Sequence, residues 1–417
     1  MLANFFDKVI HAPFNPFLPI FVAETLGRPQ SFAAAFRAAE TLAQTLASFG
    51  FGLLSTNARA KTALVLAALN TPLAAAVFLM RSPSLLMVAA AVHGALSGVA
   101  SSVSSLYLVT LAPPERLGAA SSLQYVGATL GSAIGSAIGG MILARGAGGK
   151  AGGFGALAGV MLASSVPVLL VIMLAMPSLG AGTERDNEAS STRTSSSSSV
   201  PPSSQRSLGD LLRVPAVDYL LLMQGLRTCW WGSTSMSIPY LLNALTNGNK
   251  SMVGLYSLGS LTSAMLVMLL GGALSDAHRP HGGGYIVRGA LCLLAVLSPM
   301  IGIAGAAGSA AGVFVAGWVA TCLAWTVSGQ VNPLVGAVAE HLRDSEGGGG
   351  EEGRLTGLVS AAWAAGSLCG GQLHGRFVEG TRSLWVLYVA LGGVLLLAER
   401  ATARLVHTLQ QDREAKQ

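Results

Sequence analysis

The feature that most constrains this chain is a series of apolar stretches, each about twenty residues long. Only 11% of the 417 residues are charged. A soluble domain carries roughly 25% charged residues, so this chain has too few charges to cover a water-facing surface. Apolar stretches of this length are typical of transmembrane helices, whereas strands of a membrane barrel alternate over roughly ten residues. The sequence therefore predicts an all-α membrane protein.

Twelve transmembrane helices can be placed along the chain, six before and six after a polar segment at 177–213. The polar segment contains a serine run and a Pro-Pro pair, and such a composition cannot bury enough apolar surface to fold. The predicted helices are 3–26, 31–54, 62–80, 84–110, 118–144, 153–176, 215–246, 252–274, 285–305, 310–340, 355–378 and 383–400. The predicted organisation is an N-terminal six-helix bundle (1–176), a disordered cytoplasmic linker (177–213), a C-terminal six-helix bundle (214–400) and a cytoplasmic tail (401–417).

The distribution of basic residues predicts the orientation in the membrane. With the N-terminus inside, the inner segments and termini hold sixteen of the assigned Lys and Arg residues, and the outer segments hold seven. Both termini are therefore predicted to be cytoplasmic. The formal net charge of +6 then belongs to the loops and requires no nucleic-acid partner. The four cysteines stand singly in apolar runs without metal-ligand spacing, so we expect no metal and no disulfide framework.

The two halves of the chain share short motifs at an offset of 220 residues. The matches are Leu18-Pro19 with Ile238-Pro239, Gly52 with Gly272, and Arg59 with Arg279. Parallel repeats of this kind build a substrate site between two halves in many secondary transporters. The repeat therefore predicts two pseudo-symmetric six-helix bundles with a site between them.

Several segments resemble the major facilitator superfamily, over essentially the whole chain. The segment 15–19 is similar to the proline pair in the first helix of the twelve-helix, proton-coupled drug and metabolite exporters of that family. The segment 113–116 resembles the cytoplasmic lead into helix five. The segment 131–140 resembles the antiporter motif of helix five, with Ser136 where proline is usual and the glycines Gly131, Gly135, Gly139 and Gly140.

Glycines at this spacing remove side chains from one helix face and let two backbones approach. The resemblance implies that this face packs near helix eight, where Gly254 and Gly259 could receive it. Two features depart from the family. The loop after Gly52 has Thr56 in place of the family's aspartate, although the second copy keeps the acid as Asp276. The arginine of helix four is also absent.

Polar residues within the helices are the candidate site, because burying them in hydrocarbon costs a few kcal/mol each unless they face a cavity or a partner. The resemblance implies that helices one, four, seven and ten line the transport cavity. The predicted substrate-binding residues are Asn15, His93, Gln224, Arg227, Trp231, Trp325, Gln330 and Asn332. For the tryptophans, stacking on a substrate and plain packing both remain open.

Arg227 and Glu40 are the two charges of greatest interest. Arg227 lies near the middle of its helix, where it needs a carboxylate, a substrate anion or water. Glu40 lies about nine residues into its helix and is the candidate proton carrier. A local ion pair with Arg37 is the alternative for Glu40, and a structural ion pair is the alternative for Arg227. A further hypothesis combines the two residues: Arg227 and Glu40 form the charged pair of the transport cycle.

The sequence contains no catalytic motif or cofactor motif, so we expect neither an enzyme nor a cofactor. The predicted function is proton-coupled export of a small organic molecule by alternating access. Two alternatives remain: uptake or facilitated diffusion of a polar metabolite or organic anion, and a non-transporting membrane sensor or scaffold. The expected partners are a small-molecule substrate, protons and the lipid bilayer, and we expect a monomer.

Overall fold

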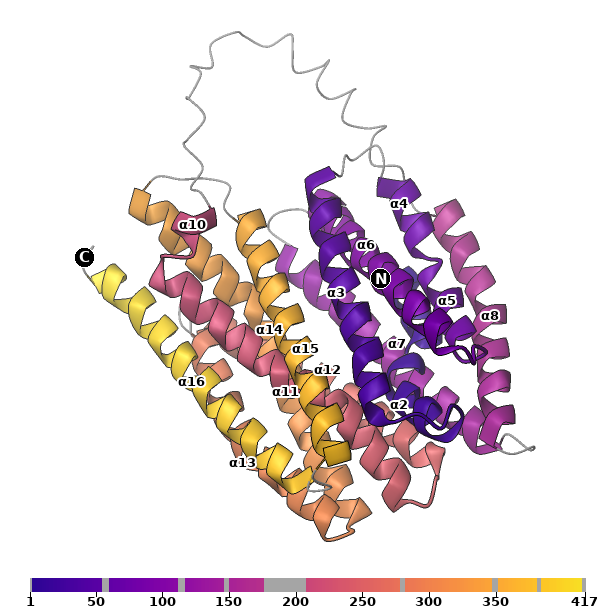
Figure 1. Cartoon of the computed structure of the whole chain (residues 1–417). Helices are drawn as coiled ribbons and strands as arrows, with labels where there is room; N and C mark the ends of the chain where they lie inside the picture. Colours follow the sequence, from indigo (N-terminus) through magenta and orange to yellow (C-terminus); the bar gives the residue numbers. More distant parts are fainter. Residues whose placement is uncertain are drawn as a thin grey trace, which may run out of the picture.

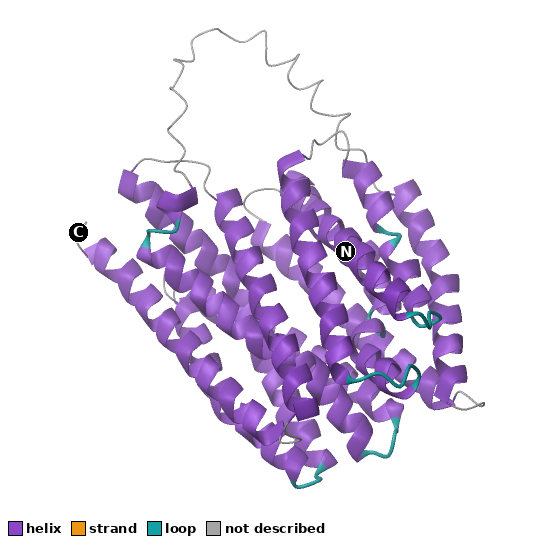
Figure 2. Ribbon diagram, viewed as in Figure 1, coloured by secondary structure: helices purple, strands orange, loops and turns teal. Residues whose placement is uncertain are grey.

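The computed structural model describes most of the chain. The described residues are 2–54, 60–111, 117–145, 150–175, 208–277, 282–346, 352–380 and 384–414. Within these ranges the structure consists of α-helices and short turns, and Figure 2 shows no strand among them. The predicted all-α architecture is therefore confirmed for the part of the chain that the structure describes.

The helices of the N-terminal half are α1 (Leu2–His11), α2 (Phe14–Glu24), α3 (Gln30–Leu54), α4 (Ala60–Ala67), α5 (Asn70–Val77), α6 (Pro83–Leu111), α7 (Leu117–Arg145) and α8 (Lys150–Ala175). The short α10 (Leu208–Leu211) precedes the C-terminal half. That half consists of α11 (Pro215–Leu245), α12 (Lys250–Ala277), α13 (Gly282–Ala306), α14 (Ala310–Glu346), α15 (Glu352–Gly380) and α16 (Leu384–Glu414). Because α1 with α2 and α4 with α5 each form one interrupted crossing, the described helices make six crossings in each half.

The two halves lie side by side and repeat the same arrangement (Figure 1). In the N-terminal half α7 packs on α1 and α6 packs on α3, and in the C-terminal half α15 packs on α11 and α14 packs on α12. Contacts between the halves obey the same symmetry, because α3 meets α15 and α7 meets α12, with α2 against α11 between them. The predicted pair of pseudo-symmetric bundles is confirmed.

Seven of the described helices contain a segment long and apolar enough to cross a membrane. The segments are Pro83–Ser104, Val126–Arg145, Gly153–Leu174, Lys250–Ser275, Gly283–Ala306, Ala310–Leu342 and Leu384–Gln411. The remaining crossings are interrupted or polar: α3 carries Arg37 and Glu40, and α11 carries Arg227. In α3 and α11, charged residues of the candidate site lie within the crossing.

Three prolines shape the first crossing, α1 with α2. Proline has no N–H, so each one leaves the carbonyl four residues earlier without its helical hydrogen bond. The affected pairs are Pro13 with Val9, Pro16 with Ala12, and Pro19 with Asn15. The helix is interrupted between His11 and Phe14 as a result.

Neighbouring helices supply donors to two of these carbonyls. The hydroxyl of Ser136 in α7 donates to the carbonyl oxygen of Ala12 at 3.4 Å. Arg37 in α3 donates from Nη2 to the carbonyl oxygen of Asn15, also at 3.4 Å. Backbone groups in a membrane must be satisfied within the protein. Ser136 therefore provides a donor that the family's usual proline at this position could not.

Glycines allow equivalent helix pairs of the two halves to touch through their backbones. A Cβ added at Gly135 of α7 would lie 1.9 Å from the carbonyl oxygen of Val9 in α1. In the C-terminal half, a Cβ added at Gly370 of α15 would lie 1.9 Å from the carbonyl oxygen of Cys229 in α11. No side chain fits at such distances, so only glycine permits this approach.

The helix bounds agree with the predicted ones to within a few residues, except at the C-terminus. The helix α16 continues to Glu414, through most of the segment predicted as a tail from 401 onward. Ala401, Leu405 and Val406 are buried, and this helical spacing keeps one face of the extension packed. The predicted linker contains α10 at its end, and residues 177–207 of it lie outside the described residues.

Substituting Gly370 with alanine should destabilise the C-terminal half, because the added methyl group overlaps the carbonyl of Cys229. Overpacking of this kind costs about 1–3 kcal/mol. Thermal unfolding in detergent should show a lower midpoint for Gly370→Ala. The matched control is Gly393→Ala in α16, where a Cβ would meet nothing within 4 Å. Equal midpoints for the two variants would contradict the backbone contact.

Candidate functional site

The N-terminal half holds a polar cluster between α2, α3 and α6, here called the Glu40 cluster (Asn15, Arg37, Glu40 and His93), in which Glu40 and His93 are buried. Glu40 is 7% exposed, and each of its carboxylate oxygens has its own partner. Arg37 Nη1 lies 2.6 Å from Oε2, and His93 Nδ1 lies 2.9 Å from Oε1. Arg37 also donates from Nη2 to Asn15 Oδ1 at 2.6 Å. Arg37 therefore links Asn15 to Glu40, and Glu40 in turn contacts His93.

Close packing of α3 against α6 positions His93. A Cβ added at Gly94 would lie 2.0 Å from the carbonyl oxygen of Glu40, so the two backbones touch beside the histidine. His93 is fully buried, and its ring centroid lies 4.9 Å from that of His11 and 4.7 Å from that of Phe14. These ring contacts fix the imidazole plane. The carboxylate thus lies between a guanidinium and an imidazole ring.

The C-terminal half holds a second polar cluster between α11 and α14, here called the Arg227 cluster (Gln224, Arg227 and Ser328). Arg227 is 5% exposed. Its Nε and Nη2 donate to Gln224 Oε1 at 3.2 and 3.0 Å, and its Nη1 donates to the Ser328 hydroxyl. Two neutral residues therefore hold the planar guanidinium in a fixed orientation, as a site for a carboxylate or similar anion requires.

A pair of tryptophans lies one helical turn from the Arg227 cluster. Trp231 follows Arg227 by four residues on α11, and Trp325 precedes Ser328 by three on α14. The two rings pack edge to face, with centroids 5.6 Å apart at 77°. Trp325 Nε1 is buried without a hydrogen-bond partner among the described residues. A donor in that state is available to a ligand.

Gln330, another predicted site residue, lies apart from this group in the structure. A Cβ added at Gly283 of α13 would lie 3.2 Å from Gln330 Oε1, and one at Gly271 of α12 would lie 3.7 Å from its Nε2. The side chain therefore points toward α12 and α13. The physical reason is angular, because residues two apart on a helix lie about 200° apart, so Gln330 and Ser328 face opposite ways. The surroundings of Gly52, Asp276 and Asn332 lie outside what the structure describes, and a Cβ at Gly272 would meet nothing within 4 Å.

Glu40 and Arg227 belong to separate clusters in this structure. Glu40 is bonded to Arg37 and His93 of its own half, whereas Arg227 is bonded to Gln224 and Ser328 of the other half. The helix α3 meets the C-terminal half through α15, and α11 meets the N-terminal half through α2. The hypothesised contact between the two charges is therefore not a feature of this conformation, although each charge has a polar cluster of its own.

The helix that carries the glycine motif, α7, packs both on α1 of its own half and on α12, the predicted helix eight, as expected. A Cβ at Gly131 would lie 2.4 Å from the carbonyl oxygen of Phe5, and one at Gly139 would lie 2.7 Å from Pro13 Cβ. With Gly135 on Val9, three of the four glycines therefore contact the interrupted first crossing. The physical cause is that α1 needs a close backbone neighbour beside its proline break.

The motif contacts α12 through Gly140, and also through Ser136 and Ala137, which lie against Gly254. A Cβ at Gly140 would lie 2.8 Å from the carbonyl oxygen of Lys250 and 3.0 Å from Gly254 Cα. Gly254 receives α7 as expected, but Gly259 does not, since its added Cβ would lie 2.6 Å from the ring of Trp318. The contact between α7 and α12 thus includes the last turns of α7.

An ion pair joins the two halves at the end of the bundle where α2 ends and α12 begins, here called the far end. Lys250 Nζ lies 2.8 Å from Glu24 Oε2, and Asn243 Nδ2 donates to Glu24 Oε1 at 2.8 Å. Sequence reasoning counted Lys250 only as a loop charge. No local pattern could have found the pair, because its members are 226 positions apart, from 24 to 250.

The contact of α3 with α15 lies at the same end. A Cβ at Gly375 would lie 3.1 Å from Ser31 Cα and from Ala34 Cβ, near the start of α3. His374, the preceding residue, is fully buried, and neither ring nitrogen has a hydrogen-bond partner among the described residues. Together with the Gly140 contact, these interactions close the far end of the interface between the halves.

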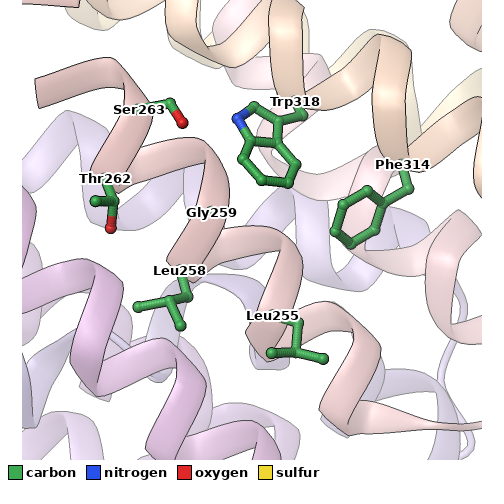
Figure 3. A pocket seen from close by; sticks show the side chains of 7 residues that line it. All are labelled: Leu255, Leu258, Gly259, Thr262, Ser263, Phe314 and Trp318. Carbon is green, nitrogen blue, oxygen red and sulfur yellow. The ribbon is translucent and has the colours of Figure 1, made fainter. Parts of the chain in front are cut away.

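A pocket also lies between α12 and α14, and its lining differs in composition from both clusters (Figure 3). Its lining is almost entirely apolar and includes Leu255, Leu258, Phe314 and Trp318, with only the hydroxyls of Thr262 and Ser263. None of the predicted substrate-binding residues lines it. This pocket therefore offers little polar chemistry compared with the two clusters.

Comparison with known proteins agrees with this architecture. Residues 1–366 match the family model described as Major Facilitator Superfamily. The chain is similar to a bacterial homologue of the iron transporter ferroportin in an inward-facing state, with 15% identity, 97% of each chain covered and a TM-score of 0.67.

Two further solved structures share the fold. The nucleoside transporter NupG is 11% identical, with 97% of this chain and 98% of that chain covered and a TM-score of 0.69. A bacterial metal transporter is 16% identical, with 97% and 96% covered and a TM-score of 0.63. No curated protein matches the chain by sequence. At these identities the likeness concerns the fold alone.

Removing the charge of Glu24 should loosen the far end, because Glu24→Gln keeps the shape but loses the ion pair with Lys250. The measurement is thiol labelling of a cysteine placed at Ser31, in a chain whose native cysteines are replaced with alanine. We expect labelling several times faster in Glu24→Gln. The matched control is Glu399→Gln, which breaks an ion pair of the same length, 2.8 Å to Arg288, within one half.

An equal increase in labelling for the Glu399 variant would show a general loosening of the fold. Unchanged labelling in Glu24→Gln would show that the glycine contacts close the far end without the ion pair.

Proposed function

Because the chain belongs to the Major Facilitator Superfamily, and is therefore a transporter rather than an enzyme, we propose that it exports a small organic molecule in exchange for protons. The observation that carries the proton coupling is the Glu40 cluster. A carboxylate is held there, out of bulk water, between the Arg37 guanidinium and the His93 imidazole. Exchange of substrate and protons in opposite directions is supported by the resemblance of segment 131–140 to the antiporter motif. Three of the glycines in that segment pack against the first crossing.

Glu40 is the proton carrier in this proposal, and His93 is its exchange partner. The carboxylate accepts from two donors, Arg37 and His93. A proton that arrives on Glu40 weakens the bond between Glu40 and Arg37, and passing that proton to His93 restores the bond. In the structure the His93 ring is stacked on His11 and lies tilted against Phe14, and neither contact depends on the proton. The cluster can therefore change its charge without unpacking α6 from α3.

Alternating access is supported by where the halves touch. The Glu24–Lys250 pair, the Gly140 contact and the Gly375 contact all lie at the far end. The predicted orientation makes the opposite end, where α10 lies, cytoplasmic. In that orientation the far end is the outer gate, and the conformation corresponds to the inward-facing state given for the ferroportin homologue.

A second candidate function, uptake or facilitated diffusion of an organic anion, is favoured by the Arg227 cluster. Arginine presents a planar fork that matches a carboxylate, and Gln224 and Ser328 hold this fork in place. The Trp231–Trp325 pair offers an apolar surface one turn away. Direction of transport separates the two candidates, whereas an anionic substrate is compatible with both.

The proton role is tested by flux into reconstituted vesicles, with a panel of radiolabelled small organic anions, cations and neutral solutes. A pH gradient, acidic on the side that the far end faces, should drive export in the unmodified protein. Glu40→Gln should lose this gradient-driven transport yet retain exchange at equal pH, because the amide keeps the shape but carries no proton. Glu399→Gln is the control acid. Gradient-driven export in Glu40→Gln equal to that of the unmodified protein would remove the proton role.

The anion role is tested by substrate affinity in the same vesicles. Arg227→Ala should weaken binding of an anionic substrate about ten- to a hundredfold, the size of a lost hydrogen bond to a charged group. Arg227→Lys should recover only part of it, because lysine lacks the planar fork. Arg213→Ala, at a side chain 85% exposed, is the control. Intact affinity in Arg227→Ala would leave this arginine a structural role.

A further inference from the structure

Arg37 occupies an unusual position, because it bonds two helices that serve different purposes. One side of its guanidinium bonds the proposed proton carrier Glu40 within α3, at 2.6 Å. The other side bonds α2, through Asn15 Oδ1 at 2.6 Å and the Asn15 carbonyl oxygen at 3.4 Å. That carbonyl is free to accept because Pro19 cannot donate to it. Arg37 is therefore the polar link between α2 and the proton cluster.

The same helix α2 ends at the gate. Asn15 stands at its second position and Glu24 at its last. Nine positions separate them, about 13 Å along a helix. Residues between them are almost all fully buried, including Phe17, Leu18 and Phe21. A densely packed helix of this length moves as a rigid body. A shift at Asn15 is thus carried to the carboxylate that binds Lys250 and Asn243.

We propose that Arg37 couples the charge of Glu40 to the far-end gate, with α2 as the rigid connection between them. This inference rests on the proposed proton role of Glu40. With Glu40 ionised, Arg37 is held on α3 and in turn holds Asn15, which fixes α2 with Glu24 on Lys250. When Glu40 takes up a proton, the Arg37–Glu40 ion pair is lost. The link from α2 to α3 then weakens, and the far end opens.

Other titratable groups near this path are few. His93 of α6 and His11 of α1 face the Glu40 cluster, and His374 of α15 lies against the start of α3 at the far end. His93 is part of the proton site, whereas His374 is a separate source of pH dependence. A test must therefore separate Arg37 from His374.

The experiment follows labelling of a cysteine at Ser31 against pH, normalised to a cysteine at Arg28, which is exposed at the same end. In the unmodified protein the normalised rate should rise about tenfold once the pH is lowered far enough to protonate Glu40, the size of one charge-assisted hydrogen bond. Arg37→Gln should abolish this dependence, and Arg37→Lys, which can reach one partner at a time, should keep part of it. Asn15→Ala should reduce it, because it removes the shorter bond to α2. His374→Gln should leave it unchanged.

The outcomes separate this inference from the proposed function. Export driven by a pH gradient in the unmodified protein, together with a full pH dependence of labelling in Arg37→Gln, would overturn the coupling role while leaving Glu40 as proton carrier. Absence of gradient-driven export in the unmodified protein would overturn the proposed function itself. Loss of the pH dependence in His374→Gln, with its retention in Arg37→Gln, would assign the sensitivity to His374 and overturn the inference.

Discussion

In the hydrocarbon of a membrane, a backbone carbonyl without a donor costs several kcal/mol, and the first crossing has three carbonyls that proline leaves without their helical donors. Much of the N-terminal half is arranged around them. The Gly135 backbone approaches Val9, the Ser136 hydroxyl bonds Ala12, and Arg37 bonds Asn15. The last of these bonds brings a cation into the membrane, where it needs a counter-charge, and Glu40 supplies it. Arg37 thus both satisfies the backbone of the first crossing and forms part of the candidate proton site.

The two halves meet this common problem of buried polarity in different ways. The N-terminal half balances charge with charge, in the Arg37–Glu40 ion pair, and adds a titratable ring. The Arg227 guanidinium is instead oriented by neutral side chains, Gln224 and Ser328. An internal ion pair suits a site that exchanges protons, and a fork held by neutral groups suits a site that receives an anion. The difference supports separate tasks for two bundles that otherwise share one architecture.

Sequence patterns predicted the fold well because membrane crossings depend on local composition. The length of each apolar stretch placed the helices to within a few residues, apart from α16, whose helical spacing of Ala401 and Leu405 continues the packed face. Arg37, Glu40, His93 and Arg227 could be singled out because polarity within a crossing is costly wherever it occurs. The local Arg37–Glu40 pair was among the alternatives, and the structure contains it. Partners on other helices could not be assigned, since these depend on how helices rotate. Gln330 lies apart from the Arg227 cluster for that reason, and the Glu24–Lys250 pair joins segments without local relation.

The central claim is that a proton on Glu40 and the transport cycle are linked. The most direct measurement is proton release or uptake by the purified protein in weakly buffered detergent solution when substrate binds, compared with Glu40→Gln. At a pH at which Glu40 is protonated, the account predicts that substrate binding displaces close to one proton from the unmodified protein and none from the variant, because only Glu40 connects the two events. Equal proton release from both proteins would contradict the account and place the coupling group elsewhere in the chain.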